Sequence, residues 1–244
     1  MARKHPILKG LGVLCVFILV MFAGVFFYAY LTGGDSKVIS MFSGDGIGVL
    51  QIEGTIDDSQ SVLSELKRFK DSPWIKAIVV RIDTPGGAVA PTQEIFEAIQ
   101  KARVKKPLIA SMGSMATSGG YYIASACETI VANPGTLTGS IGVIMQFNNV
   151  EELMKKIGVK GYNIKSGANK DIGSPLQPLS PEGRQVLQCL VDNVYGQFVS
   201  AVASGRGMDE AQVRKLADGR VYSGAQAKEN GLVDQFGTLE DAIE

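Results

Sequence analysis

From residue 47 onward, short apolar runs alternate with segments in which apolar residues recur at helical spacing. The apolar runs lie at 48–52, 77–82, 107–112 and 141–147. The segments with helical spacing are 61–69, 92–102, one that begins near Ser118, and 150–157. Such alternation is typical of parallel strands joined by crossover helices. The sequence therefore predicts an α/β fold for this part of the chain.

The last third of the chain shows clear start signals for helices. YNIKS at 162–166 predicts one more strand before them. Ser180 and Pro181 supply an N-cap and a first-turn proline, and apolar residues then recur at helical spacing to about Ser204. SGAQ at 223–226 fits a capping box. We therefore predict a long helix followed by a short one.

An apolar run without any charge precedes this domain, at residues 11–31. At 1.5 Å per residue, such a helix is about 30 Å long, which is enough to cross the hydrocarbon core of a bilayer. Basic residues precede the run and Asp35 is the first charge after it, so the positive-inside rule places the N-terminus in the cytoplasm. A cleaved signal peptide is the alternative, but its apolar region is shorter and ends in small residues, whereas this run ends in Phe26, Phe27 and Tyr28.

We therefore predict a membrane anchor that is retained and a domain tethered to it on the outer face. The residues that join the two are rich in Gly, Ser and Asp, a composition typical of a flexible tether. The predicted parts are a cytoplasmic N-terminus (1–10), a transmembrane anchor (11–31), a linker (32–46) and a folded domain (47–244).

Charge and composition narrow the classes of function. The chain has 24 basic and 24 acidic residues, so there is no electrostatic case for binding nucleic acid. Its cysteines, Cys15, Cys127 and Cys189, are far apart and odd in number, which suggests neither a disulfide framework nor a zinc site. We expect no metal. The only histidine is His5, before the apolar run, which excludes a histidine base in the folded domain.

Two glycine-bearing loops follow two of the predicted strands, DTPGG at 83–87 and SMATSGG at 114–120. Because the carboxyl ends of parallel strands meet at one edge of a sheet, both loops can border one crevice. Ser118 in the second loop can be a helix N-cap. It can also be a nucleophile, with the backbone N–H groups of Gly119 and Gly87 as donors to the oxygen that becomes negative. The residues alone leave both interpretations open.

A nucleophilic serine needs a group that takes its proton. With histidine excluded, lysine is the remaining base. Its reference pKa of about 10.4 keeps it protonated at neutral pH, so a lysine base must be desolvated or placed near other donors. The chain contains many lysines, and their spacing does not choose among them.

Four motifs occur in an order that is more specific than any one of them. They are RIDTPGG (81–87), GSMATSGGYYIASA (113–126), GTLTGSIGV (135–143) and IKSGANKDIGSP (164–175). On these motifs the chain, from about Gly46 to its C-terminus, resembles the signal peptide peptidase A family. These are serine-lysine peptidases, here of the membrane-anchored, single-domain bacterial type.

The resemblance implies roles for five residues. Ser118 would be the nucleophile, Lys170 the general base, and Ser140 a hydroxyl that orients the lysine. The N–H groups of Gly87 and Gly119 would form the oxyanion hole. Only the resemblance selects Lys170 and Ser140, which otherwise read as a surface lysine and a turn serine. No cofactor is implied, because nucleophile and base are both side chains.

The resemblance also implies an architecture, an assembly and a location. The family fold is similar to that of ClpP and crotonase, with stacked ββα units, and its single-domain members form rings in which serine and lysine come from neighbouring protomers. We expect an endopeptidase that degrades remnant signal peptides and other apolar peptides at the outer face of the bacterial cytoplasmic membrane, with residues 11–31 in the lipid. A crotonase-type acyl-thioester enzyme and an inert membrane scaffold are the alternatives.

Overall fold

The computed structural model describes residues 19–21 and 46–244, and the chain divides into two units, Met1–Gly46 and Ile47–Glu244. The predicted anchor lies outside the described residues except for 19–21, which are helical. The predicted N-terminus and linker lie outside them too. Within the described ranges, none of the helices combines the length and the apolar character that crossing a bilayer requires.

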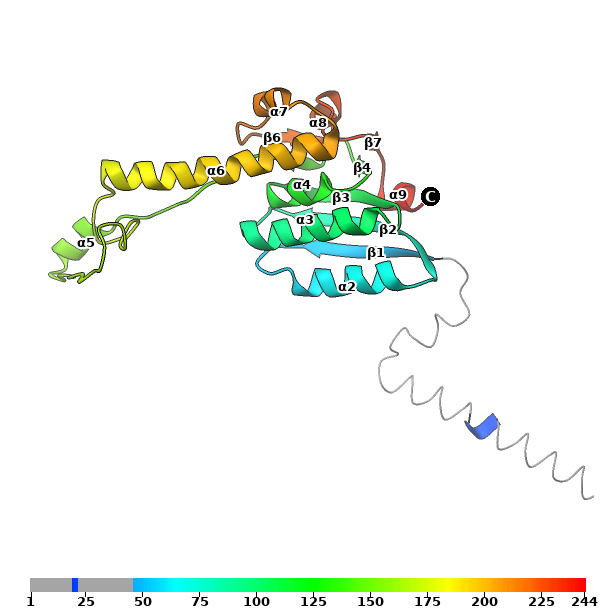
Figure 1. Ribbon diagram of the computed structural model, residues 1–244, viewed down its shortest axis with the longest axis horizontal. Helices are drawn as coiled ribbons and strands as arrows, with labels where there is room; N and C mark the ends of the chain where they lie inside the picture. The colour runs from blue at the N-terminus through cyan, green and yellow to red at the C-terminus, as the bar shows by residue number, and fades with distance from the viewer. Residues whose placement is uncertain (1–18, 22–45) are drawn as a thin grey trace, which may run out of the picture. The chain divides into compact units, whose positions relative to one another are not determined.

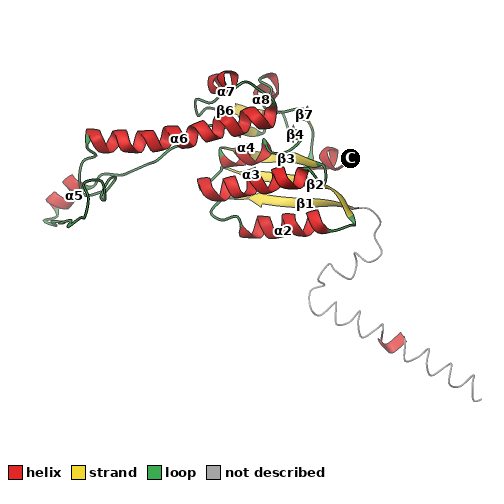
Figure 2. Ribbon diagram, in the orientation of Figure 1, coloured by secondary structure: helices red, strands yellow, loops and turns green. Residues whose placement is uncertain are grey.

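The second unit is built on a mixed sheet of seven described strands (Figures 1 and 2). The strands are β1 (Gly46–Glu53), β2 (Ile75–Thr84), β3 (Leu108–Thr117), β4 (Thr129–Ala132), β5 (Leu137–Gly139), β6 (Val221–Ser223) and β7 (Gln235–Phe236). Their order is β1-β2-β3-β4-β7, with β5 paired to β3 and β6 paired to β5. β2 and β3 pair in parallel, as the sequence predicts. β4, β5 and β7, which were not predicted, also pair in parallel with their neighbours, and β6 pairs antiparallel with β5.

The predicted helices are present and begin at their predicted signals. The described helices are α2 (Gln60–Asp71), α3 (Val89–Arg103), α4 (Gly119–Ala124), α5 (Glu151–Lys156), α6 (Pro181–Arg206), α7 (Glu210–Leu216), α8 (Gly224–Glu229) and α9 (Leu239–Ile243). Ser180 Oγ accepts the N–H of Gly183 at 2.9 Å and caps α6. α8 begins with the capping box of Ser223 and Gln226. Both helix predictions in the last third of the chain are confirmed.

Two predicted strands, 141–147 and 162–166, are not strands. Both segments are rich in residues that favour extended backbone, but a strand also needs a neighbour that accepts and donates its peptide hydrogen bonds. Neither segment pairs with the described sheet, and Ile144 and Ile164 are largely exposed. The stretch from about residue 144 to 180, which we call the arm, instead lies beyond the sheet (Figure 1).

The core lies between the sheet and the helices α2, α3 and α4, which cover one of its faces. Alternate residues of β2, Ile78, Val80 and Ile82, are fully buried on this side with Ile95 and Ile99 of α3. Val79 points to the opposite face, where α9 packs. Full burial of each such side chain contributes about 1.5–3 kcal/mol, so this layer fixes the carboxyl ends of β2 and β3 relative to each other.

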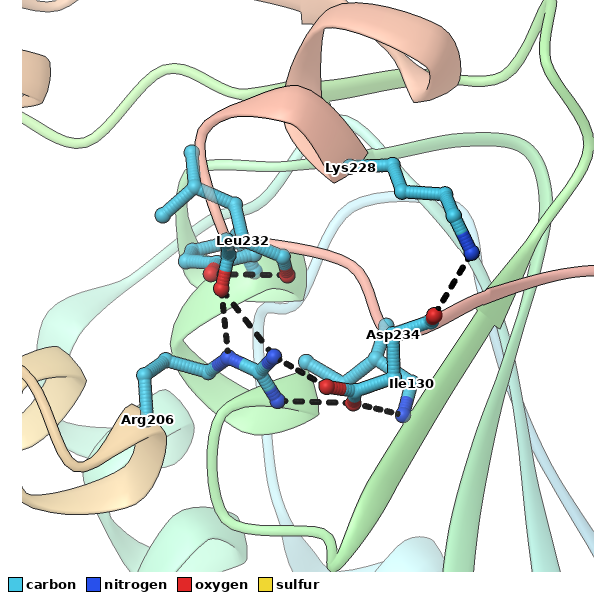
Figure 3. Close-up of polar contacts among 7 residues, drawn as sticks. Ile130, Arg206, Lys228, Leu232 and Asp234 are labelled. Carbon is cyan, nitrogen blue, oxygen red and sulfur yellow. Dashed lines mark hydrogen bonds and ion pairs between the residues drawn. The ribbon is translucent and has the colours of Figure 1, made fainter.

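An ion pair attaches the C-terminal end of α6 to the sheet (Figure 3). The guanidinium of Arg206, whose side chain is only 7% exposed, bonds to the carboxylate of Asp234 and to the carbonyl of Gly231. Asp234 also accepts the N–H of Ile130 in β4 at 2.8 Å. Burial would raise the pKa of Asp234, but the bonds from Arg206 and Ile130 outweigh it and hold the pKa below its usual value. The carboxylate therefore favours the folded state only while it is ionised.

Replacing Asp234 by Asn is expected to destabilise the domain at neutral pH but much less in acid. The free energy of unfolding should fall by about 2 kcal/mol. This is less than for a fully buried ion pair, because the Asp234 side chain is 35% exposed. Because the pKa of Asp234 is lower in the folded state, the ion pair stabilises the fold fully above the pKa of the unfolded chain, about 3.9. This stabilisation is lost as the pH falls through the pKa of the folded state. Urea unfolding of both full-length proteins at pH 7 and pH 3 measures the difference. A difference that stays constant over this range would contradict the assignment.

Candidate active site

Ser118 lies on a strained turn between β3 and α4. Its backbone has φ 53° and ψ −118°, a conformation that costs a residue other than glycine about 1–3 kcal/mol. The turn is held by the N–H of Ser118, which donates to Gly139 O at 2.9 Å, and by its carbonyl, which accepts the N–H of Tyr122. Although Ser118 occupies the N-cap position of α4, its side chain makes no capping bond. The helix-cap interpretation is therefore wrong, and the hydroxyl is available for other chemistry.

The DTPGG loop packs directly against this turn. Gly86 has φ 102°, and a Cβ placed on it would stand 2.8 Å from both the backbone nitrogen of Gly119 and the Cβ of Ser118. Contacts this short exclude any side chain at Gly86. The two glycine-bearing loops therefore meet backbone to backbone, as the sequence predicts.

The N–H groups of Gly87 and Gly119 border the same cavity as Ser118. Gly87 forms a parallel bridge with Ile56. In this bridge the N–H of Ile56 donates to Gly86 O, and the N–H of Ala88 donates to Ile56 O. In such a bridge the N–H of the middle residue points away from the partner. Gly119 is the first residue of α4, where N–H groups have no partner within the helix. The structure thus brings Ser118, Gly87 and Gly119 together at one cavity.

The cavity beside these groups has a volume of about 110 Å³ and mainly apolar walls. Its lining includes Val89, Thr92, Tyr122, Val143, Ile144, Val194 and Phe198. The ring of Tyr122 packs on Phe96 and Phe198, with centroids 4.9 and 4.7 Å apart. The sequence analysis missed these wall residues. A signal was present in Val194 and Phe198, which are four residues apart on one face of α6.

Ser140 lies on the other side of Ser118, in a second cavity of about 430 Å³ that both serines line. Its backbone also has a positive φ, 51°, and its N–H donates to Arg220 O at 2.8 Å. Asp218, which borders this cavity, has its pKa lowered to about 2 by hydrogen bonds from Arg220. The predicted auxiliary hydroxyl is thus near the predicted nucleophile, and a carboxylate that stays ionised lies beside them.

Lys170 is not near Ser118 within one chain. Lys170 is exposed in the arm, where its backbone N–H donates to Gly167 O at 3.2 Å. Neither of the two cavities that Ser118 lines has a lysine among the described residues around it. A single chain therefore supplies the serine and both backbone donors but brings no amine to them.

Tyr121 holds the first turn of α4 against the body of the domain. Its phenol is fully buried and donates to Leu232 O at 3.0 Å. Burial raises the pKa of this phenol, so the hydroxyl remains protonated and keeps its role as a donor. Leu232 lies in the chain between Gly231 and Asp234, which Arg206 binds, so the short helix after Ser118 is tied to the same ion pair that anchors α6.

The fold and the site define a class of protein. A solved structure of a ClpP1 variant from Listeria monocytogenes has a similar fold, with a TM-score of 0.55 and 17% identity over 80% of this chain and 94% of that one. The profile of peptidase family S49 matches residues 100–244. The chain belongs to peptidase family S49, and this membership implies a serine-type protease.

Proteins from several bacteria resemble the chain over most of its length. A Synechocystis protein provisionally named as a protease is 46% identical over 80% of this chain and 71% of its own length. A protein of Enterococcus faecium, provisionally named signal peptide peptidase SppA, is 43% identical over 76% of this chain and 54% of its own. Protease 4 of Salmonella typhi is 37% identical over 82% of this chain but only 34% of its own. The chain thus spans a third to about 70% of these relatives.

Proposed function

We propose that this S49 protease cleaves peptides through an acyl-enzyme formed on Ser118, with Lys170 as the base. The observation that carries the proposal is the turn at Ser118. A strained serine that does not cap its helix lines a cavity together with Gly87 and Gly119. Strain of this kind persists only where the surrounding structure enforces it, and it concentrates at functional sites.

The proposed reaction has two stages. The oxygen of Ser118 attacks the scissile carbonyl while the Lys170 amine accepts its proton, and the N–H groups of Gly87 and Gly119 bind the oxygen that becomes negative. The amine then returns the proton to the leaving nitrogen, the C–N bond breaks, and the acyl group stays on Ser118. In the second stage water attacks this ester while Lys170 again takes a proton. The amine returns this proton to the Ser118 oxygen as the ester C–O bond breaks, and the second peptide product leaves with a free carboxyl group. Ser140 orients the amine.

We propose that the Lys170 of each site comes from a neighbouring copy in a ring-shaped assembly. Three observations support this. The amine lies in the arm, away from Ser118 of its own chain. The cavity that Ser118 shares with Ser140 has a volume of about 430 Å³, enough to hold a lysine side chain. The arm and the first half of α6 expose many large apolar side chains, among them Ile144, Tyr162 and Leu190, as expected of surfaces that pack in an assembly.

The proposed substrates are extended peptides with apolar residues, including remnant signal peptides. The mainly apolar cavity beside Ser118 suits an apolar side chain next to the scissile bond. Residues 141–147 run beside that cavity without sheet partners, so their peptide groups can pair with an extended substrate. The location we propose is the bacterial cytoplasmic membrane, with 11–31 as a single-pass anchor and the protease domain on the outer face. The basic residues before this apolar run support that orientation.

Covalent labelling tests the proposed chemistry directly. The full-length protein in detergent is treated with a serine-directed phosphonate, digested and mapped by mass spectrometry. We expect one adduct, on Ser118, because the oxyanion donors activate only this hydroxyl. An apolar peptide substrate should slow the formation of this adduct, because both bind at the same site. Labelling of other serines, with Ser118 unmodified, would contradict the proposal.

A further inference from the structure

The two proposed oxyanion donors belong to different loops, so something must fix the distance between them. Gly87 follows β2, whereas Gly119 begins α4 after β3. Both N–H groups must reach the same oxygen at about 2.7–3.1 Å. The main-chain pairing of β2 with β3 ends at Thr84 and Ala116, before either donor is reached. The sheet alone therefore does not set this distance.

The hydroxyl of Thr117 bridges the gap. Thr117 directly precedes Ser118, its side chain is buried, and its hydroxyl donates to Pro85 O at 3.1 Å. Pro85 has no N–H and so cannot continue the ladder with β3. Its carbonyl is instead bound by the side chain of the residue next to the nucleophile. This bond joins the loop of Gly87 to the turn of Ser118 at a position where proline cannot donate a backbone hydrogen bond.

The other side of the loop is held independently of Thr117. The hydroxyl of Thr84, which is fully buried, donates to Gly54 O and accepts the N–H of Gly86 at 3.0 Å. Ile56 adds its N–H to Gly86 O at 3.0 Å. These bonds tie the loop to the residues after β1. Only the Thr117 hydroxyl, among the side-chain bonds of the described residues, ties Pro85 to the nucleophile turn.

We propose that Thr117 is a positioning residue, whose hydroxyl sets the distance between the Gly87 donor and the Ser118 turn. This inference rests on the proposed function. Thr117 lines neither of the two cavities beside Ser118 and acts through the carbonyl of Pro85, two residues before Gly87. Without the hydroxyl, Thr84 still bonds to Gly54 O and Ile56 still bonds to Gly86 O, but Pro85 loses its hydrogen bond to β3. Gly87 then points less accurately at the oxygen that becomes negative in the transition state.

The expected result is a loss in kcat with little change in KM. Thr117→Val keeps the side-chain shape and the preference for β structure but removes the hydroxyl. Its kcat should fall about 10- to 100-fold, which does not exceed the fall in kcat expected when one oxyanion donor is removed. Thr117→Ser restores the donor, so its kcat should return to within a few-fold of the wild type. The binding of a peptide boronate, which forms a tetrahedral adduct, should weaken by the same factor as kcat in Thr117→Val.

Thr136→Val is the matched control. Thr136 is also buried, and its hydroxyl donates to a β3 carbonyl, Gly113 O, at 2.8 Å, but it does not contact the DTPGG loop. Both valine variants should lose similar stability, measured as the thermal midpoint, while only Thr117→Val loses kcat. If Thr117→Val does not fold, comparison of Thr117→Ala with Thr117→Ser gives the same contrast.

Three outcomes would overturn the inference. They are an unchanged kcat in Thr117→Val, an equal loss of kcat in Thr136→Val, and a Thr117→Ser variant that is as slow as Thr117→Val. Failure of the proposed function is recognised separately, because the phosphonate would then leave Ser118 unlabelled. If Ser118 is labelled and any of these three outcomes is found, the positioning role alone is wrong.

Discussion

Ser118→Ala is expected to abolish peptide hydrolysis while the protein keeps its fold and assembly. The change removes one oxygen, and with it the atom that forms the acyl-enzyme. The loss in kcat/KM should be at least about 10⁴-fold, since removal of a nucleophile leaves only binding and the oxyanion donors. Because the Ser118 side chain makes no capping bond, the substitution breaks no structural hydrogen bond of α4. Hydrolysis of an apolar fluorogenic peptide, with thermal unfolding of the same samples, measures both quantities.

Ser114→Ala is the matched control for this experiment. Ser114 is an exposed serine of β3, the strand that precedes Ser118, and its backbone N–H, which the substitution retains, bonds to the Asp83 carboxylate. Its hydrolysis rate should equal that of the wild type. A Ser118→Ala protein that still cleaves at more than about a hundredth of the wild-type rate would contradict the assignment of the nucleophile, because contaminants and residual catalysis account for less.

β2 and β3 were predictable because they are long and buried. β2 has ten residues and β3 has ten, long enough for a continuous apolar run bounded by turn residues to stand out. β5 and β6 have three residues each and β7 has two, too short to show any period. Their pairing depends on contacts between residues far apart in sequence, such as Leu137 with Ser223. These short strands, and β4 with its four residues, were therefore missed.

The wrong strand predictions in the arm have a common cause. Residues 141–147 and 162–166 have the composition of strands, but composition gives only a preference for extended backbone. Whether hydrogen bonds form depends on a partner edge, and the described chain offers none to either segment. For 141–147, the position beside the Ser118 cavity suggests that the missing partner is the substrate, which a single sequence cannot reveal.

The site was only partly predictable for a related reason. Ser118 and its two glycines lie at loops that follow strands, so topology alone places them together. The strain at Ser118, its unused capping position and the Thr117 bond depend on coordinates. Lys170 was selected by family resemblance alone, and its exposed place in the arm neither requires nor forbids the role.

Lys170→Ala is expected to reduce hydrolysis at least about 10³-fold, as loss of a general base does. Lys160→Ala, which removes an exposed lysine from the same arm, should retain wild-type activity. These two variants separate the loss of one particular amine from a general loss of positive charge on the arm. An active Lys170→Ala protein would show that a different group accepts the proton of Ser118.

Mixing Ser118→Ala with Lys170→Ala protein tests whether sites are shared between copies. Each variant alone should be inactive. If serine and lysine come from neighbouring protomers, a site in a mixed ring works when a chain with Ser118 stands next to a chain with Lys170. Random mixing at equal amounts then gives about a quarter of wild-type activity, since each of the two neighbours is correct half the time. If both groups came from one chain, every site would lack one of them. Mixed rings, verified by exchange of labelled subunits, would then stay inactive, and the arm would have to fold back onto its own Ser118.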